Sequence, residues 1–250
     1  MGKTKGSFPH DFQDGRGEVE VRRHENGGGL VEVSAWADPT VYVASEASIR
    51  EGCVVRDDAS IDDCAVVSGG VVSGRARIKD RATVSGGNIS GEALISGKSR
   101  IEGDPEIAGR AEVSGSAIVR GSAQIINRAV ISGGIVEGRA RIGGTVVMRS
   151  GRVAGRAMIG GNVTISGSGV RIGGDAFIEG NEEGLAIRGG AGGPVINGET
   201  QLRNVSGIIK GESSGSPWLV DAVFSGEEVS FSGDMKIGIL GREPKEAEAS

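Results

Sequence analysis

The chain has very few histidines, cysteines and aromatic residues. Its 250 residues include two histidines and two cysteines, and aromatic residues make up 3%. Two cysteines, Cys53 and Cys64, cannot build a disulfide framework, so both are expected as reduced thiols. No paired-cysteine metal motif, phosphate-binding glycine loop or nucleophile elbow occurs. The sequence therefore predicts no catalytic residue, no metal site and no cofactor.

Long apolar runs and an excess of positive charge are also missing. No stretch approaches the ~20 apolar residues of a membrane-spanning helix, and the N-terminus Met-Gly-Lys-Thr-Lys lacks the apolar segment of a signal peptide. The net charge is −5, whereas a nucleic-acid footprint would need a basic patch. We therefore expect a cytoplasmic protein that binds neither membranes nor nucleic acid.

What the sequence does contain is a six-residue repeat, clearest between Pro105 and Ser132. Each repeat has a small residue followed two positions later by Ile or Val. Residues two apart in a strand face the same side, so both enter the core. Each hexad is then one short strand plus a corner, which is typical of a β-solenoid. The 46 glycines supply corners that need positive φ.

The repeat predicts regular coils of three strands from Ala47 to about Gly180. The aliphatic residues stack in three columns, with successive coils 17 or 18 residues apart. The predicted third column passes through Ile131, Val147 and Ile165. Burying each Ile or Val contributes roughly 1.5–3 kcal/mol, whereas ordering each backbone residue costs about 1–2 kcal/mol. A single coil cannot stand alone, so the stability must come from stacking.

The chain divides into four parts. Residues 1–17 are polar and are expected as a mobile arm, or as a segment that orders on a neighbour. Residues 18–40 contain a β-hairpin around Asn26-Gly27, which caps the solenoid, and an incomplete first coil. Residues 41–210 form the β-helix, and residues 211–250 form a linker and a β-rich tail. The predicted fold class is all-β: a parallel β-helix with a hairpin cap and a short β-rich C-terminal extension.

Three features together resemble the YdcK-like family of bacterial hexapeptide-repeat proteins. They are Gly27-Gly28-Gly29-x-Val31, the central hexads, and Gly193-Pro194-x-Ile196-Asn197-Gly198-Glu199. The likeness covers roughly residues 20–210, with Leu30 where the family often has Trp, and the segment after residue 211 has no counterpart. The resemblance implies a left-handed parallel β-helix that forms a homo-oligomer, with a trimer favoured. Such proteins are often labelled transferases because hexapeptide-repeat acyltransferases share the fold.

The histidines test that transferase label. Acyltransferases that look like this use a histidine as general base, and γ-type carbonic anhydrases need three histidines on zinc. This chain has only His10 and His24, both outside the regular coils. The sequence therefore favours a non-catalytic rigid scaffold or binding module. A divergent acyltransferase that uses His24 is the alternative, and a polymer-forming protein of bactofilin type, or a virion or surface component, is the third.

Polar residues gather at two turns that could hold a small molecule. One group is His24, Glu25 and Asn26 at the hairpin turn, and the other is Asn197 and Glu199 at the end of the helix. Asn-Gly turns also occur for purely structural reasons.

Two acidic pairs resemble a calcium site on paper. They are Asp57-Asp58 and Asp62-Asp63. The register places the pairs at successive corners of one coil, separated by a strand, so we expect solvated corners rather than a cation site.

Outward-facing aliphatic residues are the candidate interface. β-Branched residues at outward positions either simply suit a strand or mark a subunit or partner surface. The partner would be another copy of the chain or another protein. The candidate interface residues are Val54, Val71, Ile118, Ile135, Val130 and Val146.

Overall fold

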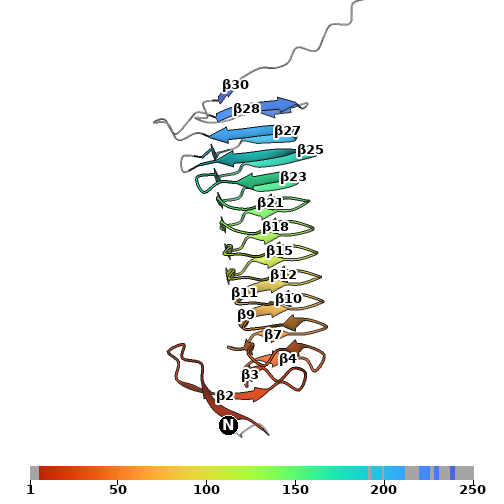
Figure 1. The fold of residues 1–250 in the computed structure, drawn as a ribbon, viewed down its shortest axis with the longest axis vertical. Coiled ribbons are helices and arrows are strands. Elements are labelled where there is room, and N and C mark those ends of the chain that lie inside the picture. The colour runs from red at the N-terminus through yellow and green to blue at the C-terminus, as the bar shows by residue number, and fades with distance from the viewer. Residues whose placement is uncertain are drawn as a thin grey trace, which may run out of the picture.

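The computed structural model describes residues 6–190, 193–198, 200–211, 220–225, 228–230 and 237–239. It is a parallel β-solenoid of about ten stacked coils (Figure 1). No helix occurs in the part of the chain that the structure describes. The predicted all-β class and β-helix architecture are therefore confirmed, while the left-handed winding stays a prediction from the resemblance.

Each coil has three faces, and several longer strands pass from one face to the next. The first face contains β3 (Leu30–Glu32), β6 (Ser48–Ile49), β9 (Val66–Val72), β11 (Thr83–Ile89), β13 (Arg100–Gly103), β16 (Ile118–Gly121), β19 (Ile135–Val136), β22 (Arg152–Val153), β24 (Arg171–Ile172) and β26 (Val195–Ile196). The second face contains β4 (Trp36–Ala37), β7 (Val54–Val55), the ends of β9 and β11, β14 (Glu106–Ile107), β17 (Gln124–Ile125), β20 (Arg141–Ile142), and the starts of β23 (Met158–Ser166), β25 (Phe177–Gly189) and β27 (Gln201–Gly211). The third face contains β5 (Tyr42–Val43), β8 (Ser60–Ile61), β10 (Arg77–Ile78), β12 (Leu94–Ile95), β15 (Glu112–Val113), β18 (Val130–Ile131), β21 (Val147–Met148) and the ends of β23, β25 and β27.

One column of buried aliphatic residues runs down the inside of each face, as the hexads predict. The first column is Val31, Ile49, Val67, Val84, Ile101, Val119, Val136, Val153, Ile172 and Ile196. The second is Ala37, Val55, Val72, Ile89, Ile107, Ile125, Ile142, Ile159, Ile178 and Leu202. In this order, these ten residues define coils 1 to 10. The third is Val43, Ile61, Ile78, Ile95, Val113, Ile131, Met148, Ile165, Ile187 and Ile209.

The third column corrects the predicted register at one coil. Met148, not Val147, pairs with Ile131 of the preceding coil and with Ile165 of the following coil, and lies 17 residues from each. Val146 occupies the small-residue position and is fully buried, while Val147 faces outward. Thr145 looked like the small residue of this hexad because two valines follow it. The structure instead keeps an even spacing of 17 residues between coils and buries both Val146 and Met148.

The N-terminal hairpin forms as predicted, but it also completes the first coil. β2 (Glu18–Arg23) pairs antiparallel with β3, and β3 pairs parallel with β6 of the next coil. With β4 and β5, the return strand of the hairpin supplies all three faces of coil 1. The coil expected to be incomplete is therefore whole, because one strand serves both the cap and the coil.

Residues 6–17, within the predicted mobile arm, lie against the solenoid. β1 (Phe8–Asp11) pairs antiparallel with β2. In the loop that follows, Arg16 contacts Asp14 at 2.8 Å and Glu32 at 3.1 Å, and Asp14 lies 3.4 Å from Arg50. The hydrogen bond from Arg16 lowers the pKa of Asp14 to about 2. Ion pairs between charged residues that are far apart in sequence thus hold this loop on the first two coils.

This loop predicts a stability difference at low pH. The pKa of Asp14 is depressed in the folded state from 3.8 to about 2, so its contribution is present above about pH 4 and is lost as the pH falls toward 2. Asp14→Asn should therefore be less stable than wild type in urea at pH 5, and the difference should shrink as the pH falls from 4 through 2. Asp58→Asn, at an exposed corner, is the control. A difference that stays constant from pH 5 to pH 2 would contradict the ion-pair explanation.

Antiparallel strands also lie on the last coil. β27 pairs antiparallel with β28 (Val220–Ser225) and with β29 (Glu228–Ser230), and β28 pairs parallel with β30 (Ile237–Ile239). The short β-rich C-terminal extension is thus part of the fold. The edges of the first and last coils each pair with antiparallel strands at opposite ends of the solenoid (Figure 1).

Candidate functional site

His24 is buried and both of its ring nitrogens are engaged. His24 is 3% exposed and lies at the junction of the hairpin and coil 1. Nε2 lies 3.1 Å from the carbonyl oxygen of Asp38. Nδ1 lies 3.3 Å from both the backbone nitrogen and the carbonyl oxygen of Asn26. His24 therefore links the hairpin turn to the corner after β4, with both ring nitrogens against backbone groups.

The other two residues of this predicted site differ in role. The side-chain amide of Asn26 donates to the Thr40 carbonyl at 3.3 Å, and the backbone carbonyl of Asn26 accepts from the Val43 N–H at 2.9 Å. Gly27 lies so close to Val43 that a Cβ there would collide with its backbone. Asn26 and the glycines thus fix the turn onto coil 1. Glu25 is exposed and, with His24, borders a hollow of about 410 Å³ beside β4.

Asn197 lies at the far end of the solenoid from His24. It follows β26 in the last coil, its side chain is exposed, and its carbonyl accepts from the Thr200 hydroxyl at 2.8 Å. Glu199 lies outside the described residues. The structure therefore does not bring the two predicted polar groups together.

The acidic corners form hydrogen bonds between coils. Asp57, Asp63 and Asp80 have positive φ. The Asp57 carboxylate accepts from Gly74 N–H of the next coil at 2.8 Å, and Asp80 accepts from Gly97 N–H at 2.8 Å. Among the described residues, no three His, Cys, Asp or Glu side chains lie close enough to hold a metal ion. These carboxylates join the corner of one coil to the corner of the next.

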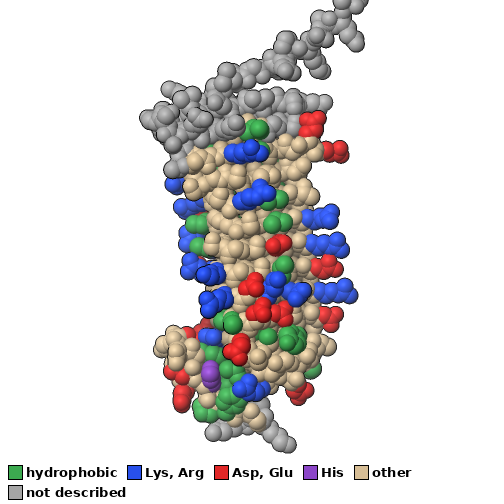
Figure 2. All heavy atoms as spheres, viewed as in Figure 1, with side chains coloured by type: hydrophobic (Ala, Val, Ile, Leu, Met, Phe, Trp, Pro, Cys, Tyr) green, Lys and Arg blue, Asp and Glu red, His purple; other side chains and the backbone are tan. Residues whose placement is uncertain are grey.

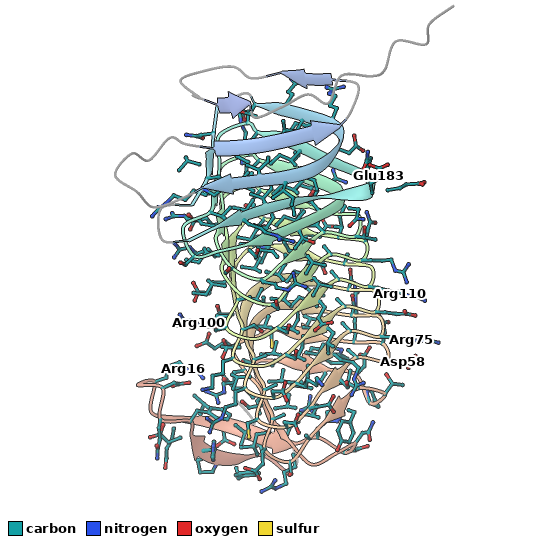
Figure 3. All side chains as sticks on the ribbon, turned by 45° about the horizontal axis from the view of Figure 1, so that its top comes forward. Arg16, Asp58, Arg75, Arg100, Arg110 and Glu183 are labelled. Atoms are coloured by element: carbon teal, nitrogen blue, oxygen red, sulfur yellow. The ribbon has the colours of Figure 1, made fainter. Side chains whose placement is uncertain are left out.

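Charged side chains form networks along the corners and on the first face. Asp58, Arg75 and Arg110 point away from the body of the solenoid (Figure 3), and Arg110 pairs with Glu92 at 2.8 Å. On the first face, Glu137 lies between Arg120 and Arg152. Burial opposes ionisation of Glu137, but hydrogen bonds from the two arginines outweigh it and lower its pKa.

The cysteines differ in exposure. Cys53 fills a small-residue position in the core, and its burial raises the pKa of its thiol to about 11, which keeps it protonated. Cys64 is exposed at a corner.

The six candidate interface residues do not form one patch. Val54 and Val71 are neighbours on the second face, and Ile118 and Ile135 are neighbours on the first. Val130 is on the third face, where its neighbour is Val147. Val146 is buried in the core, so its assignment to the interface is wrong for the register reason given above.

A groove on the second face was missed by the sequence analysis. It has a volume of about 400 Å³ and lies over coils 6 to 9. Gly143 and Gly160 line it at equivalent positions of coils 7 and 8, one residue after the inward Ile142 and Ile159. Gly143 is buried against the Ile126 side chain, whereas Gly160 is partly exposed. Ile126, Met158 and Phe177 supply apolar walls, and Arg203 lies 5.1 Å from the Phe177 ring centre. The remaining polar side chains at its edge are Asn127, Arg141 and Glu179.

The glycine at position 160 is not required by the fold. Its φ is not positive, and a Cβ added there would meet no atom within 4 Å. Most corner glycines, such as Gly161, have positive φ or press against the next coil. Glycine in a strand interior weakens the strand and often marks a site where another group approaches the backbone closely. Figure 2 shows charged side chains along both long edges of the solenoid in that view, with further charged and hydrophobic side chains on the face between them.

Comparison with protein-family models, with curated proteins and with solved structures finds no match to this chain. Among the described residues, no helix is long and apolar enough to cross a membrane.

Proposed function

We propose that this protein is a non-catalytic β-helix scaffold that works as a binding module and as a homo-oligomer. The observation that carries the proposal is the apolar groove of the second face, in which the partly exposed Gly160 has open space beside it. The resemblance to YdcK-like proteins, a left-handed winding and a cytoplasmic location are parts of the same proposal. The first two rest on the sequence motifs, and the location is the expectation stated with the sequence.

The lining of the groove suits binding better than proton transfer. Its walls are aliphatic and aromatic, and its polar side chains are Arg, Asn and Glu at the edge. Apolar surface with a few orienting polar groups is typical of recognition sites. A transferase of the expected kind needs a histidine with a free nitrogen near its acceptor. His24 is in coil 1, far from this groove, with both nitrogens bonded to the backbone.

The polymer alternative has less support than a closed assembly. End-to-end stacking through the solenoid would require open strand edges at both ends. β2 covers β3 at one end, and β28 and β29 pair with β27 at the other. Flat faces remain as the surfaces through which copies could associate.

His24→Ala separates a structural histidine from a catalytic one. Removing the ring leaves the Asn26 N–H without a partner and takes one of two hydrogen bonds from the Asp38 carbonyl, which also accepts from the Val41 N–H at 3.0 Å. We therefore expect a loss of about 1–3 kcal/mol in the free energy of unfolding. Wild type should bind no coenzyme A in native mass spectrometry and transfer no acetyl group from acetyl-CoA. His10→Ala is the control. A His24→Ala protein of wild-type stability that has lost a measurable acetyl transfer would overturn the proposal.

A further inference from the structure

Trp36 is the most exposed large apolar residue of the described chain. Its exposed fraction is 60%, compared with 43% for Met158 and 41% for Tyr42. Its indole N–H donates to the Asp38 carboxylate at 2.7 Å, which fixes the direction of the ring. Val54 and Val71 follow it in the same outward column of the second face. An oriented, exposed tryptophan beside other apolar residues is typical of a protein interface.

The groove lies on the same face as Trp36 and lacks an apolar group to fill it. Trp36 belongs to coil 1, and Gly160 belongs to coil 8. Coils are about 4.8 Å apart, so the two positions are separated by roughly 34 Å along the solenoid. Trp36 therefore cannot reach the groove of its own chain. A second copy can present its Trp36 there.

One two-fold axis satisfies both tryptophans at once. A rotation axis that lies in the plane of contact, parallel to the strands and between coils 4 and 5, brings coil 1 of each copy onto coil 8 of the other. Such a contact is isologous, with the same pair of surfaces used twice. At the axis lie Asn88 and Glu106, which are neighbours on this face. The rotation sets the Asn88 amide of each copy against the Glu106 carboxylate of its partner, a donor against an acceptor.

The size of the shared face is sufficient for a stable dimer. Eight coils at about 4.8 Å and a side of about six residues at ~3.3 Å each give roughly 760 Å² per copy. A specific interface of standard size buries about 800 Å² per partner. Near the axis the side chains of Ser90 and Ala108 are small, so two such faces can approach closely.

We propose that the second face binds a second copy of this chain in antiparallel orientation. Trp36 of each copy enters the partner's groove and packs over Gly160 between Met158 and Phe177. This inference rests on the proposed homo-oligomer and specifies its partner, site and symmetry. It favours a dimer over the trimer that the resemblance implies.

Gly160→Val tests the contact without damaging the fold. Valine suits a strand, and a Cβ at position 160 has free space within its own chain. The variant should match or exceed wild type in thermal stability when monomeric, yet its dimer should dissociate at roughly a hundredfold higher concentration. That factor follows from two symmetric contacts, each weakened about tenfold. Trp36→Ala should weaken the dimer similarly, and Ala154→Val, on the first face of the same coil, should not.

Sedimentation equilibrium of the full chain measures these dissociation constants. In a Trp218→Phe background, the emission of Trp36 should also shift to shorter wavelength as the concentration rises through the wild-type constant. A dimer that Gly160→Val and Trp36→Ala leave unchanged, a trimer, or a monomer at every concentration would overturn this inference. The coenzyme A and acetyl-transfer measurements on His24→Ala decide the non-catalytic function separately, so the two failures can be told apart.

Discussion

Gly161→Ala is expected to destabilise the solenoid by about 3 kcal/mol or more, whereas Gly160→Ala should be neutral or stabilise it by up to ~1 kcal/mol. The two glycines are adjacent and have the same chemistry. Gly161 has a φ of +68°, and its Cβ would collide with the Gly180 carbonyl of the next coil. Gly160 has ordinary φ and open space above it. Left-handed backbone and inter-coil contact thus separate a required glycine from an optional one.

Urea unfolding of both variants at one low protein concentration measures this difference. The two unfolding midpoints should lie on opposite sides of the wild-type value, or Gly160→Ala should coincide with wild type. Equal losses of stability in both variants would mean that strand propensity alone sets the effect of substitution at these positions. That result would contradict the role given to φ and to the inter-coil contact at Gly161.

Ile125→Ala is expected to cost about 2–5 kcal/mol in the free energy of unfolding. Ile125 is fully buried and stacks between Ile107 and Ile142 of the neighbouring coils. Backbone hydrogen bonds hold both neighbours at the coil spacing, so the cavity cannot collapse. Because each coil contacts only the next ones, the loss also interrupts the stack in its middle.

Ile126→Ala is the matched control, since the next residue along the chain is also isoleucine but faces outward. It is half-buried at the edge of the groove, and its truncation should cost less than about 1.5 kcal/mol. Similar losses for Ile125→Ala and Ile126→Ala would contradict the inward and outward assignment on which the three columns rest.

The core could be predicted from the sequence because a single side-chain rule repeats in every coil. Ile or Val recurs at the inward position of each face in coil after coil, and only a stacked solenoid core explains so regular a pattern. The first two columns are confirmed throughout the predicted range. The third column failed at Val147 because three apolar residues in a row offer two registers locally. Only the positions of Ile131 in the preceding coil and Ile165 in the following coil decide between the two registers.

The N-terminal part and the groove were harder to predict for different reasons. The loop around Asp14 and Arg16 is held by Glu32 and Arg50, and such pairs cannot be recognised before the coils are placed. β3 serves two structures, which a linear division into cap and coil does not anticipate. The groove did leave a signal: Gly143 and Gly160 stand 17 residues apart at equivalent positions of coils 7 and 8. Among so many corner glycines, their position distinguishes them only once the register is known.

Native mass spectrometry of the 250-residue wild-type chain is the most direct test of the antiparallel dimer. The chain has a mass of 25.4 kDa, so we expect a species of twice that mass with no added ligand. A trimer, an open series of sizes, or a species that carries the mass of coenzyme A would contradict it.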